Sequence, residues 1–351
     1  MRILVVGQGL AGTLVSHFAL QKGWDCHVID SNSPSASSVA AGMFNPMSFR
    51  RIIEVWDADA HLSAMTQAYS ELEALVKTKL LHFMPIFKCI PNQQYADEWN
   101  RKCAELKWID PIQNRIALGP GKHISHPQNT FGFGCVRGGG WVNLPLLITA
   151  WRSHLQNLNR YSSSAWTYND LDETSLAWDA IVDCRGIATA QDSLGGERLD
   201  IRGNRGEILT VTSAKTSDQA KTDDFILNFG KWALPVESCT WRLGASYEWN
   251  RTDLNPTPAT AEFLLDAAHK AMGRAERFEL IQHDVGIRPV SKDRRPAVGE
   301  LSAKHQLYTL NGLGTRGVLI APRWAKLLIE RISNKTQLPV NLQPIRLKIF
   351  S

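Results

Sequence analysis

The sequence lacks the cysteine patterns that mark zinc ribbons, redox motifs and disulfide scaffolds. Its 351 residues include only six cysteines, and no two of them form a CxxC pair. Such sparse thiols are typical of proteins in a reducing compartment. His123 and His126 lie three residues apart without a second pair of ligands, so we expect a polar loop there and no metal site.

Long apolar runs and runs of like charge are also missing. The run Ile3–Val6 stops at Gly7, far short of a secretory signal, and no run approaches the ~20 apolar residues of a membrane span. We therefore expect a cytoplasmic protein without a membrane span. The net charge of +5 is not gathered into a basic stripe, which disfavours nucleic acid as a partner.

The beginning of the chain has the pattern of a dinucleotide-binding unit. Ile3–Val6 is typical of a parallel strand buried on both faces, Leu10–Gln21 has helical spacing of apolar residues, and Cys26–Ile29 is typical of a second strand. The turn between the first strand and the helix has the spacing G-x-G-x-x-G. Together these features predict an α/β unit that binds an adenine dinucleotide.

Each glycine of this turn has a separate physical role. Gly7 allows the tight turn, Gly9 lets the backbone approach a pyrophosphate, and Gly12 lets the helix pack on the strand. The helix N-terminus offers unpaired N–H groups and a partial positive charge to the phosphates. Asp30 ends the second strand, where it can accept a hydrogen bond from a ribose hydroxyl and disfavours NADP.

The segment SSVAAGMFNP, residues 37–46, is too small and apolar for an ordinary surface loop. We interpret it as the bridge between the two halves of one cofactor. Ser37 and Ser38 can reach the pyrophosphate, and small residues follow because backbone must lie against a planar ring. Met43 and Phe44 either flank the ring or belong to the core.

A second glycine-rich turn near the C-terminus favours FAD over NAD. Leu307–Leu310 is typical of a strand and Val318–Ile332 of a helix, with three glycines and Arg316 between them. A helix N-terminus beside an arginine suits the negative charge of a reduced flavin, and NAD would leave this turn unexplained. An NAD domain would also continue directly with another helix and strand, whereas here a long helix, Val55 to about His82, follows only after the loop.

Four segments carry a resemblance to the D-amino-acid oxidase and glycine oxidase superfamily of FAD-dependent oxidoreductases. They are GQGLAG with Asp30, SSVAAGMFNP, GIRPVSKDRRPAVG (residues 286–299) and NGLGTRGVLIAP. Weaker matches are GGGWVNLPLL (residues 138–147) and WDAIVDCRGIATA (residues 178–190). The segment VAAGMFNP resembles the flavin-contacting loop of D-amino-acid oxidases, whereas the two C-terminal segments are closer to glycine oxidase and to the oxidase domain of a bacterial tRNA-modifying enzyme.

The resemblance implies an α/β fold with two domains. A discontinuous, Rossmann-like FAD-binding domain would comprise residues 1–85, 138–200 and 286–351, and an inserted, largely antiparallel α+β substrate domain would comprise residues 86–137 and 201–285. The sequence agrees in outline, because residues 206–213, 224–236 and 239–249 are β-rich with short turn-like breaks.

The resemblance also implies the chemistry. Members of this family oxidise a C–N bond beside a carboxylate, with hydride transfer to flavin N5, hydrolysis of the imine and, usually, reoxidation by oxygen. We therefore expect a small amine or amino acid as substrate and oxygen or another electron acceptor. Neither SSVAAGMFNP nor GIRPVSKDRRPAVGEL offers a cysteine or histidine for a covalent link, so non-covalent FAD is expected. The residues expected to bind FAD are Gly7, Gly9, Leu10, Ala11, Gly12, Asp30, Ser37, Ser38, Ala40, Ala41, Gly42, Met43, Gly312, Gly314, Thr315, Arg316, Gly317 and Val318.

Arg288, in GIRP, stands where the glycine-oxidase pattern has a carboxylate-binding arginine. A planar guanidinium matches a carboxylate with two hydrogen bonds, so we expect Arg288 to bind the substrate. The alternative is a structural arginine paired with Asp284 or Asp293. Tyr247 either reaches the same pocket or caps the sheet.

Two further sets of residues have more than one interpretation. Lys292, Arg294 and Arg295 form either a solvated turn or a basic rim for a larger anionic substrate. Several of the twelve tryptophans could wall the substrate cavity or pack in the core: Trp141, Trp232, Trp241 and Trp249.

Four functions are compatible with these features. The first is an oxidase of glycine, sarcosine or a D-amino acid, and the second is an oxidase of the carboxymethyl side chain of a wobble uridine in tRNA. The chain carries neither a companion methyltransferase domain nor a basic stripe, which favours the first. The third is a flavoprotein without amine oxidation, and the fourth, an NAD dehydrogenase, is disfavoured by the C-terminal turn.

Overall fold

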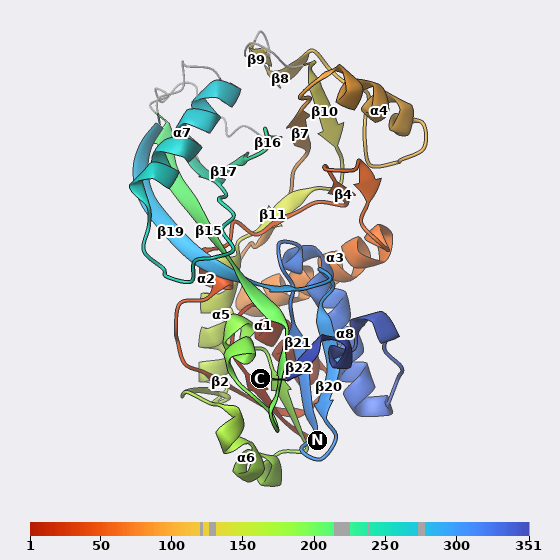
Figure 1. Cartoon of the computed structure of the whole chain (residues 1–351), viewed down its shortest axis with the longest axis vertical. Coiled ribbons are helices and arrows are strands. Elements are labelled where there is room, and N and C mark those ends of the chain that lie inside the picture. The colour runs from red at the N-terminus through yellow and green to blue at the C-terminus, as the bar shows by residue number, and fades with distance from the viewer. Residues whose placement is uncertain (120–121, 126–130, 214–224, 238, 273–277, 351) are drawn as a thin grey trace.

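The computed structural model describes residues 1–119, 122–125, 131–213, 225–237, 239–272 and 278–350, so His126 lies outside the described residues. The molecule is elongated and has two lobes, with both termini in the same lobe (Figure 1). That lobe holds a six-stranded sheet and the other holds a seven-stranded sheet. The expected α/β fold with a largely antiparallel second sheet is confirmed.

The six-stranded sheet has the order β12-β2-β1-β13-β21-β20. Its strands are β12 (Tyr161–Ser163), β2 (Asp25–Asp30), β1 (Arg2–Val6), β13 (Ala180–Asp183), β21 (Leu307–Asn311) and β20 (Ala297–Ser302). All neighbours are parallel except β20, which runs antiparallel to β21. The chain leaves β1 for β2 on one side, and β13 lies on the other. The switch point where such sheets bind ligands therefore lies between β1 and β13.

Four helices pack against this sheet and share its apolar core. They are α1 (Leu10–Gln21), α3 (Ala58–Val76), α5 (Leu144–Asn157) and α8 (Gly317–Asn334). Helix α1 has the expected bounds, but the helix expected from Val55 to about His82 is wrong at both ends. The chain turns at Lys77, which has a left-handed φ of 52°, and Glu73 accepts the N–H groups of residues 80 and 81 at 2.7 Å each. These bonds direct the chain into β6 (Leu81–Phe83).

The seven-stranded sheet has the order β10-β7-β16-β17-β18-β15-β19. Its strands are β10 (Phe133–Val136), β7 (Ile86–Cys89), β16 (Ile226–Asn228), β17 (Trp232–Glu237), β18 (Thr240–Gly244), β15 (Ile201–Ser213) and β19 (Phe278–Ser291). Only β16 and β7 are parallel neighbours. Helix α7 (Pro258–Met272) packs on one face of this sheet, and the other face meets the first lobe.

Smaller elements complete the chain. They are α2 (Ala36–Val39), β3 (Met43–Phe44), β4 (Met47–Ser48), β5 (Ile53–Glu54), α4 (Gln93–Cys103), β8 (Arg115–Gly119), β9 (Lys122–Ser125), β11 (Gly140–Val142), α6 (Leu171–Ala177), β14 (Glu197–Leu199) and β22 (Lys348–Phe350). Strands β3, β11 and β6 form a small sheet between the two large ones.

The paired strands β15 and β19 connect the two lobes (Figure 1). Their register runs from Ile201 opposite Ser291 to Ser213 opposite Phe278, so one end of the ribbon lies beside the first sheet. The boundary proposed at residue 286 falls inside β19, and the division into domains stays a prediction.

Candidate flavin and substrate site

A cavity of about 1070 Å³ lies between the carboxyl ends of the parallel strands and the inner face of the seven-stranded sheet. From the first sheet, Val6, Asp30 and Cys184 line it, at or just beyond the ends of β1, β2 and β13. From the second sheet, Ile208 and Arg288 face it. The cavity thus occupies the switch point predicted by the strand order.

The first glycine-rich turn closes one end of the cavity. Gly7 has a φ of +92°, and a Cβ there would lie 2.9 Å from the carbonyl of Cys184. Gly12 does not line the cavity, because its Cα faces the backbone of the preceding turn: a Cβ would lie 1.8 Å from the Gly7 oxygen. The N-terminus of α1 therefore approaches β1 closely, and its first N–H groups lie beside the cavity.

Asp30 is held in place at the end of β2. One carboxylate oxygen accepts the N–H of Gln8 at 3.1 Å, and the other forms an ion pair with Arg152 at 3.2 Å. The side chain is 16% exposed and lines the cavity. A fixed carboxylate at this position can accept a further hydrogen bond from a hydroxyl.

The loop after α2 forms one wall of the cavity with small residues. Ala40, Ala41, Gly42 and Met43 all line it. Gly42 has a φ of +74°, and a Cβ would lie 1.8 Å from the Val142 oxygen, so no larger residue fits this backbone. A planar ligand can approach the loop without meeting long side chains.

The two serines of this segment differ in their surroundings. The Ser37 hydroxyl lines the cavity and accepts the N–H of Leu10 at 3.1 Å. Ser38 instead exchanges hydrogen bonds with Ser35 in a capping box of α2, and it does not line the cavity. Phe44 is 2% exposed, belongs to the apolar core and also lines the cavity, so its place beside the ring stays a prediction.

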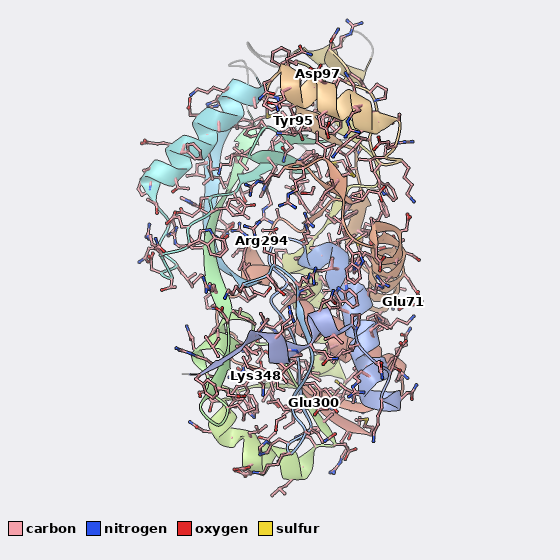
Figure 2. All side chains as sticks on the ribbon, turned by 45° about the vertical axis from the view of Figure 1, so that its right-hand side comes forward. Glu71, Tyr95, Asp97, Arg294, Glu300 and Lys348 are labelled. Carbon is pink, nitrogen blue, oxygen red and sulfur yellow. The ribbon has the colours of Figure 1, made fainter. Side chains whose placement is uncertain are left out.

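The C-terminal turn closes the cavity on another side. Gly314, Thr315, Gly317 and Val318 line it together with Arg316, whereas Gly312 lies outside the lining. Arg316 is the N-cap residue of α8 and has no ion pair within the described part of the chain. Burial and the neighbouring Arg294 lower its pKa. Figure 2 shows Arg294 between the two lobes, and its turn is exposed.

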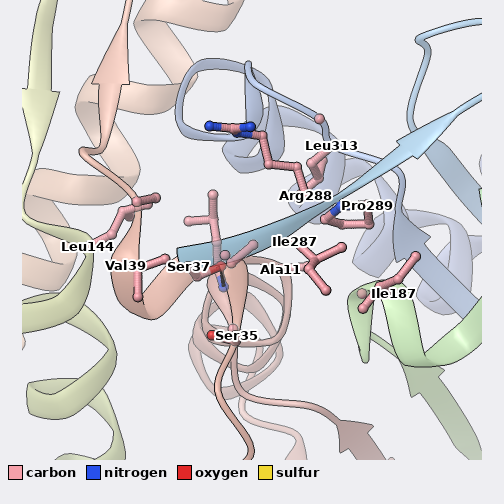
Figure 3. A pocket seen from close by; sticks show the side chains of 18 of the residues that line it. Ala11, Ser35, Ser37, Val39, Leu144, Ile187, Ile287, Arg288, Pro289 and Leu313 are labelled. Carbon is pink, nitrogen blue, oxygen red and sulfur yellow. Dashed lines mark hydrogen bonds between the residues drawn. The ribbon is translucent and has the colours of Figure 1, made fainter. Parts of the chain in front are cut away.

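Arg288 projects from β19 into the same cavity (Figure 3). Its Nη1 donates to the Asn204 side-chain oxygen at 3.0 Å, and its guanidinium carbon lies 4.8 Å from the centre of the Tyr247 ring. Neither Asp284 nor Asp293 pairs with it, since Asp293 binds Arg346. Burial lowers the pKa of Arg288, and no carboxylate neutralises it among the described residues. A partly buried cation of this kind suits an anionic ligand.

The other residues left open by the sequence also have defined places. Tyr247 lines the cavity and is 52% exposed, with its ring against Arg288. Of the four tryptophans in question, Trp232 alone lines the cavity. Trp141 and Trp241 are buried elsewhere, and Trp249 is exposed.

Sequence reasoning missed several residues of the site. Gly206, on β15, leaves room for the Arg288 guanidinium, and a glycine inside a strand is a known signal of such close approach. Arg185 follows β13, lines the cavity and pairs with Asp183 and Asp192 at 2.8 and 2.9 Å. Its position at the carboxyl end of a parallel strand was the available signal. No signal in the sequence pointed to Arg242 of β18, because the contacts of this residue are set by the tertiary structure.

The described residues contain no group of three or more histidine, cysteine, aspartate or glutamate side chains that could hold a metal ion. In the same part of the chain, no helix has the length and apolar character needed to cross a bilayer.

The arrangement fits a flavin dinucleotide. A helix N-terminus and a fixed acid at one end suit phosphates and a ribose, a wall of small residues suits a planar ring, and Arg316 at a second helix N-terminus suits negative charge. The family model described as FAD dependent oxidoreductase matches residues 2–331.

Known proteins are similar along nearly the whole chain. A tRNA 5-methylaminomethyl-2-thiouridine biosynthesis bifunctional protein MnmC from Polaromonas naphthalenivorans is 25% identical over 97% of this chain, which spans only 58% of that protein. A glycine oxidase from Pseudomonas aeruginosa is 23% identical over 95% of each chain. The crystal structure of glycine oxidase from Geobacillus kaustophilus superimposes with a TM-score of 0.77 at 18% identity, over 97% of each chain, and so shares the fold.

Proposed function

This chain belongs to the family of FAD-dependent oxidoreductases, and on that basis we propose that it oxidises the C–N bond beside a carboxylate in a small amine or amino acid. Glycine, sarcosine and D-amino acids are the candidate substrates. The observation that carries the proposal is Arg288, a partly buried cation without an acidic partner among the described residues, in the same cavity as the small-residue loop. A carboxylate bound there would place the neighbouring C–N bond inside the cavity.

The geometry supports an assignment of residues to the parts of FAD. The N-terminus of α1 and Ser37 would face the phosphates, Asp30 the ribose, the segment 40–43 the ring, and Arg316 its charged edge. FAD held by these residues would supply an acceptor for a hydride from the substrate carbon, and the imine left behind would hydrolyse in water.

The chain's own contribution is to bind and orient the substrate. Arg288 would fix the carboxylate with two hydrogen bonds, since Asn204 and Tyr247 hold its guanidinium in place. Trp232 and Ile208 give the cavity an apolar wall that limits the entry of water. No acidic or basic side chain is assigned to proton transfer.

The test is an anaerobic panel of amines and amino acids, with the visible absorbance of the bound flavin as readout. Bleaching by glycine, sarcosine or a D-amino acid is the expected result. Failure of every small amine, with bleaching by tRNA that carries a carboxymethylaminomethyl uridine, would replace the proposal with the second function. Bleaching by none of these would leave a flavoprotein without amine oxidation.

The tRNA alternative has specific support. MnmC proteins are among the relatives, and Arg294 and Arg316 add cations near the cavity that no described carboxylate pairs with. Such cations suit an anionic substrate larger than an amino acid. The small-substrate function is preferred because the sequence has no extended basic stripe.

A further inference from the structure

We propose that Arg242 is a positioning residue for the flavin: it grips two carbonyls of the loop after α2 and thereby points the loop's N–H groups toward the ring. This inference concerns the cofactor site, so it holds whichever substrate is oxidised. Arg242 lies on β18 of the seven-stranded sheet and belongs to the opposite lobe from the dinucleotide-binding turn.

Arg242 makes two hydrogen bonds from one lobe to the other. Arg242 Nη1 donates to the Ala40 oxygen at 2.9 Å, and Nη2 donates to the Val39 oxygen at 2.5 Å. Leu234, directly opposite Arg242 on β17, belongs to the same apolar cluster as Ala41. The fork of a guanidinium can bind two consecutive carbonyls at once, which a single ammonium group cannot do as well.

The direction of the carbonyls determines the direction of the N–H groups. In a trans peptide the C=O and the following N–H point to opposite sides. Because the oxygens of Val39 and Ala40 point at Arg242, the N–H groups of Ala40 and Ala41 point away from it. Both alanines line the cavity. Ala41 is 7% exposed, and its N–H makes no hydrogen bond with any described residue, so it is free to donate to a ligand or a water in the cavity.

The loop after α2 is closely packed on its neighbours, so its carbonyl groups have little freedom to move relative to Arg242. A Cβ at Gly286 of β19 would lie 2.6 Å from the Val39 side chain, and one at Gly42 would meet Val142. Arg242 itself is a partly buried cation without an ion pair in the described part of the chain, and its buried Nε has no hydrogen-bond partner there. Burial lowers its pKa, although Asp284 acts in the opposite direction. Its charge is therefore available to an electron-rich ring on the far side of the loop.

The experiment compares FAD-loaded wild type with Arg242→Gln and Arg242→Lys. In Arg242→Gln, FAD should dissociate on dilution with a Kd roughly tenfold higher, since a hydrogen bond from a charged group is worth about that factor. The flavin's reduction potential should become more negative and its visible spectrum should shift. Arg242→Lys keeps the positive charge, so the flavin's reduction potential should stay close to that of the wild type. It should bind FAD more weakly, because one ammonium group cannot hold both carbonyls as a guanidinium does.

Controls separate positioning from stability. Arg202→Gln, on the exposed start of β15, should leave affinity, potential and spectrum unchanged. A merely structural Arg242 would lower the melting temperature equally with and without excess FAD, whereas a positioning residue loses part of the FAD-dependent increment. A folded Arg242→Gln with wild-type affinity and potential overturns the proposal. If that variant does not fold, wild-type FAD affinity in Arg242→Lys overturns it.

Discussion

The guanidinium of Arg288 lies directly over the backbone of Gly206. A Cβ built on Gly206 would be 2.2 Å from both terminal nitrogens of Arg288, far inside van der Waals contact. The ring of Tyr247 also packs against the guanidinium, and Asn204 accepts a hydrogen bond from it. Arg288 is therefore fixed in a slot that only a glycine at position 206 can provide.

Gly206→Ala should displace Arg288 without touching the flavin. A misplacement of about 1 Å can cost on the order of 100-fold, so binding of a carboxylate such as acetate, followed by the flavin spectrum, should weaken by up to that factor. Gly203→Ala is the matched control, because its methyl group would meet Ile287, 2.8 Å away, rather than Arg288. Equal acetate affinity in the two variants would contradict the assigned slot.

Arg288→Ala should weaken carboxylate binding by roughly 2–5 kcal/mol, because a buried carboxylate loses its charged partner. Arg288→Lys should recover only part of this, since an ammonium does not match both carboxylate oxygens. Acetate titration gives the affinity, and the flavin absorbance per protein gives the FAD content. If affinity hardly changes while FAD stays bound, Arg288 does not contact the carboxylate.

The sequence predicted the first sheet better than the contacts of Arg288. The strand β1, the helix α1 and the turn between them depend on neighbours along the chain, so their pattern was visible locally. The alternative pairing of Arg288 with Asp284 fails for a simple reason: four residues along an extended strand separate the two residues by about 13 Å. The structure pairs Asp293 with Arg346, a partner 53 positions away.

Contacts across strands could not be read from the sequence at all. Gly206 lies opposite Gly286 because of the register of β15 and β19, and Arg242 reaches Ala40 over 202 positions. The helix expected to reach His82 ends earlier for a local reason. Glu73 accepts hydrogen bonds from the backbone after the turn at Lys77, and these bonds override the apolar pattern that continued through residues 80 and 81.

We expect acid precipitation to release FAD into the supernatant. A covalent link needs a reactive cysteine or histidine at the flavin, and no histidine lines the cavity in the described residues. Cys184 does line it, but it lies beside Gly7 at the phosphate end, and burial raises the pKa of its thiol far above the ordinary range. Yellow colour retained in the protein pellet would show a covalent bond.

The unfolding free energy should rise with pH between about 4 and 6.5 through His61. This residue is 1% exposed, with its ring edge-on to Trp324 and its Nδ1 without a hydrogen-bond partner in the described structure. Burial, and then Arg323, lower its pKa to about 4, with Asp57 opposing. Between pH 4 and 6.5 the unfolded chain therefore binds a proton at His61 that the folded chain does not bind. The free energy of unfolding consequently falls as the pH drops below 6.5.

His61→Phe should remove this contribution, worth at most about 3 kcal/mol at pH 4, while keeping an aromatic ring against Trp324. Urea unfolding of the FAD-loaded protein at pH 5, 6 and 8 measures the effect. At pH 8 the variant and wild type should differ only by packing, because His61 is neutral in both the folded and the unfolded state. At pH 5 the variant should gain stability relative to wild type.

His17 also has a pKa lowered by burial, so a residual dependence of stability on pH remains in the variant. The same slope in wild type and variant would mean that His61 is not the group that titrates.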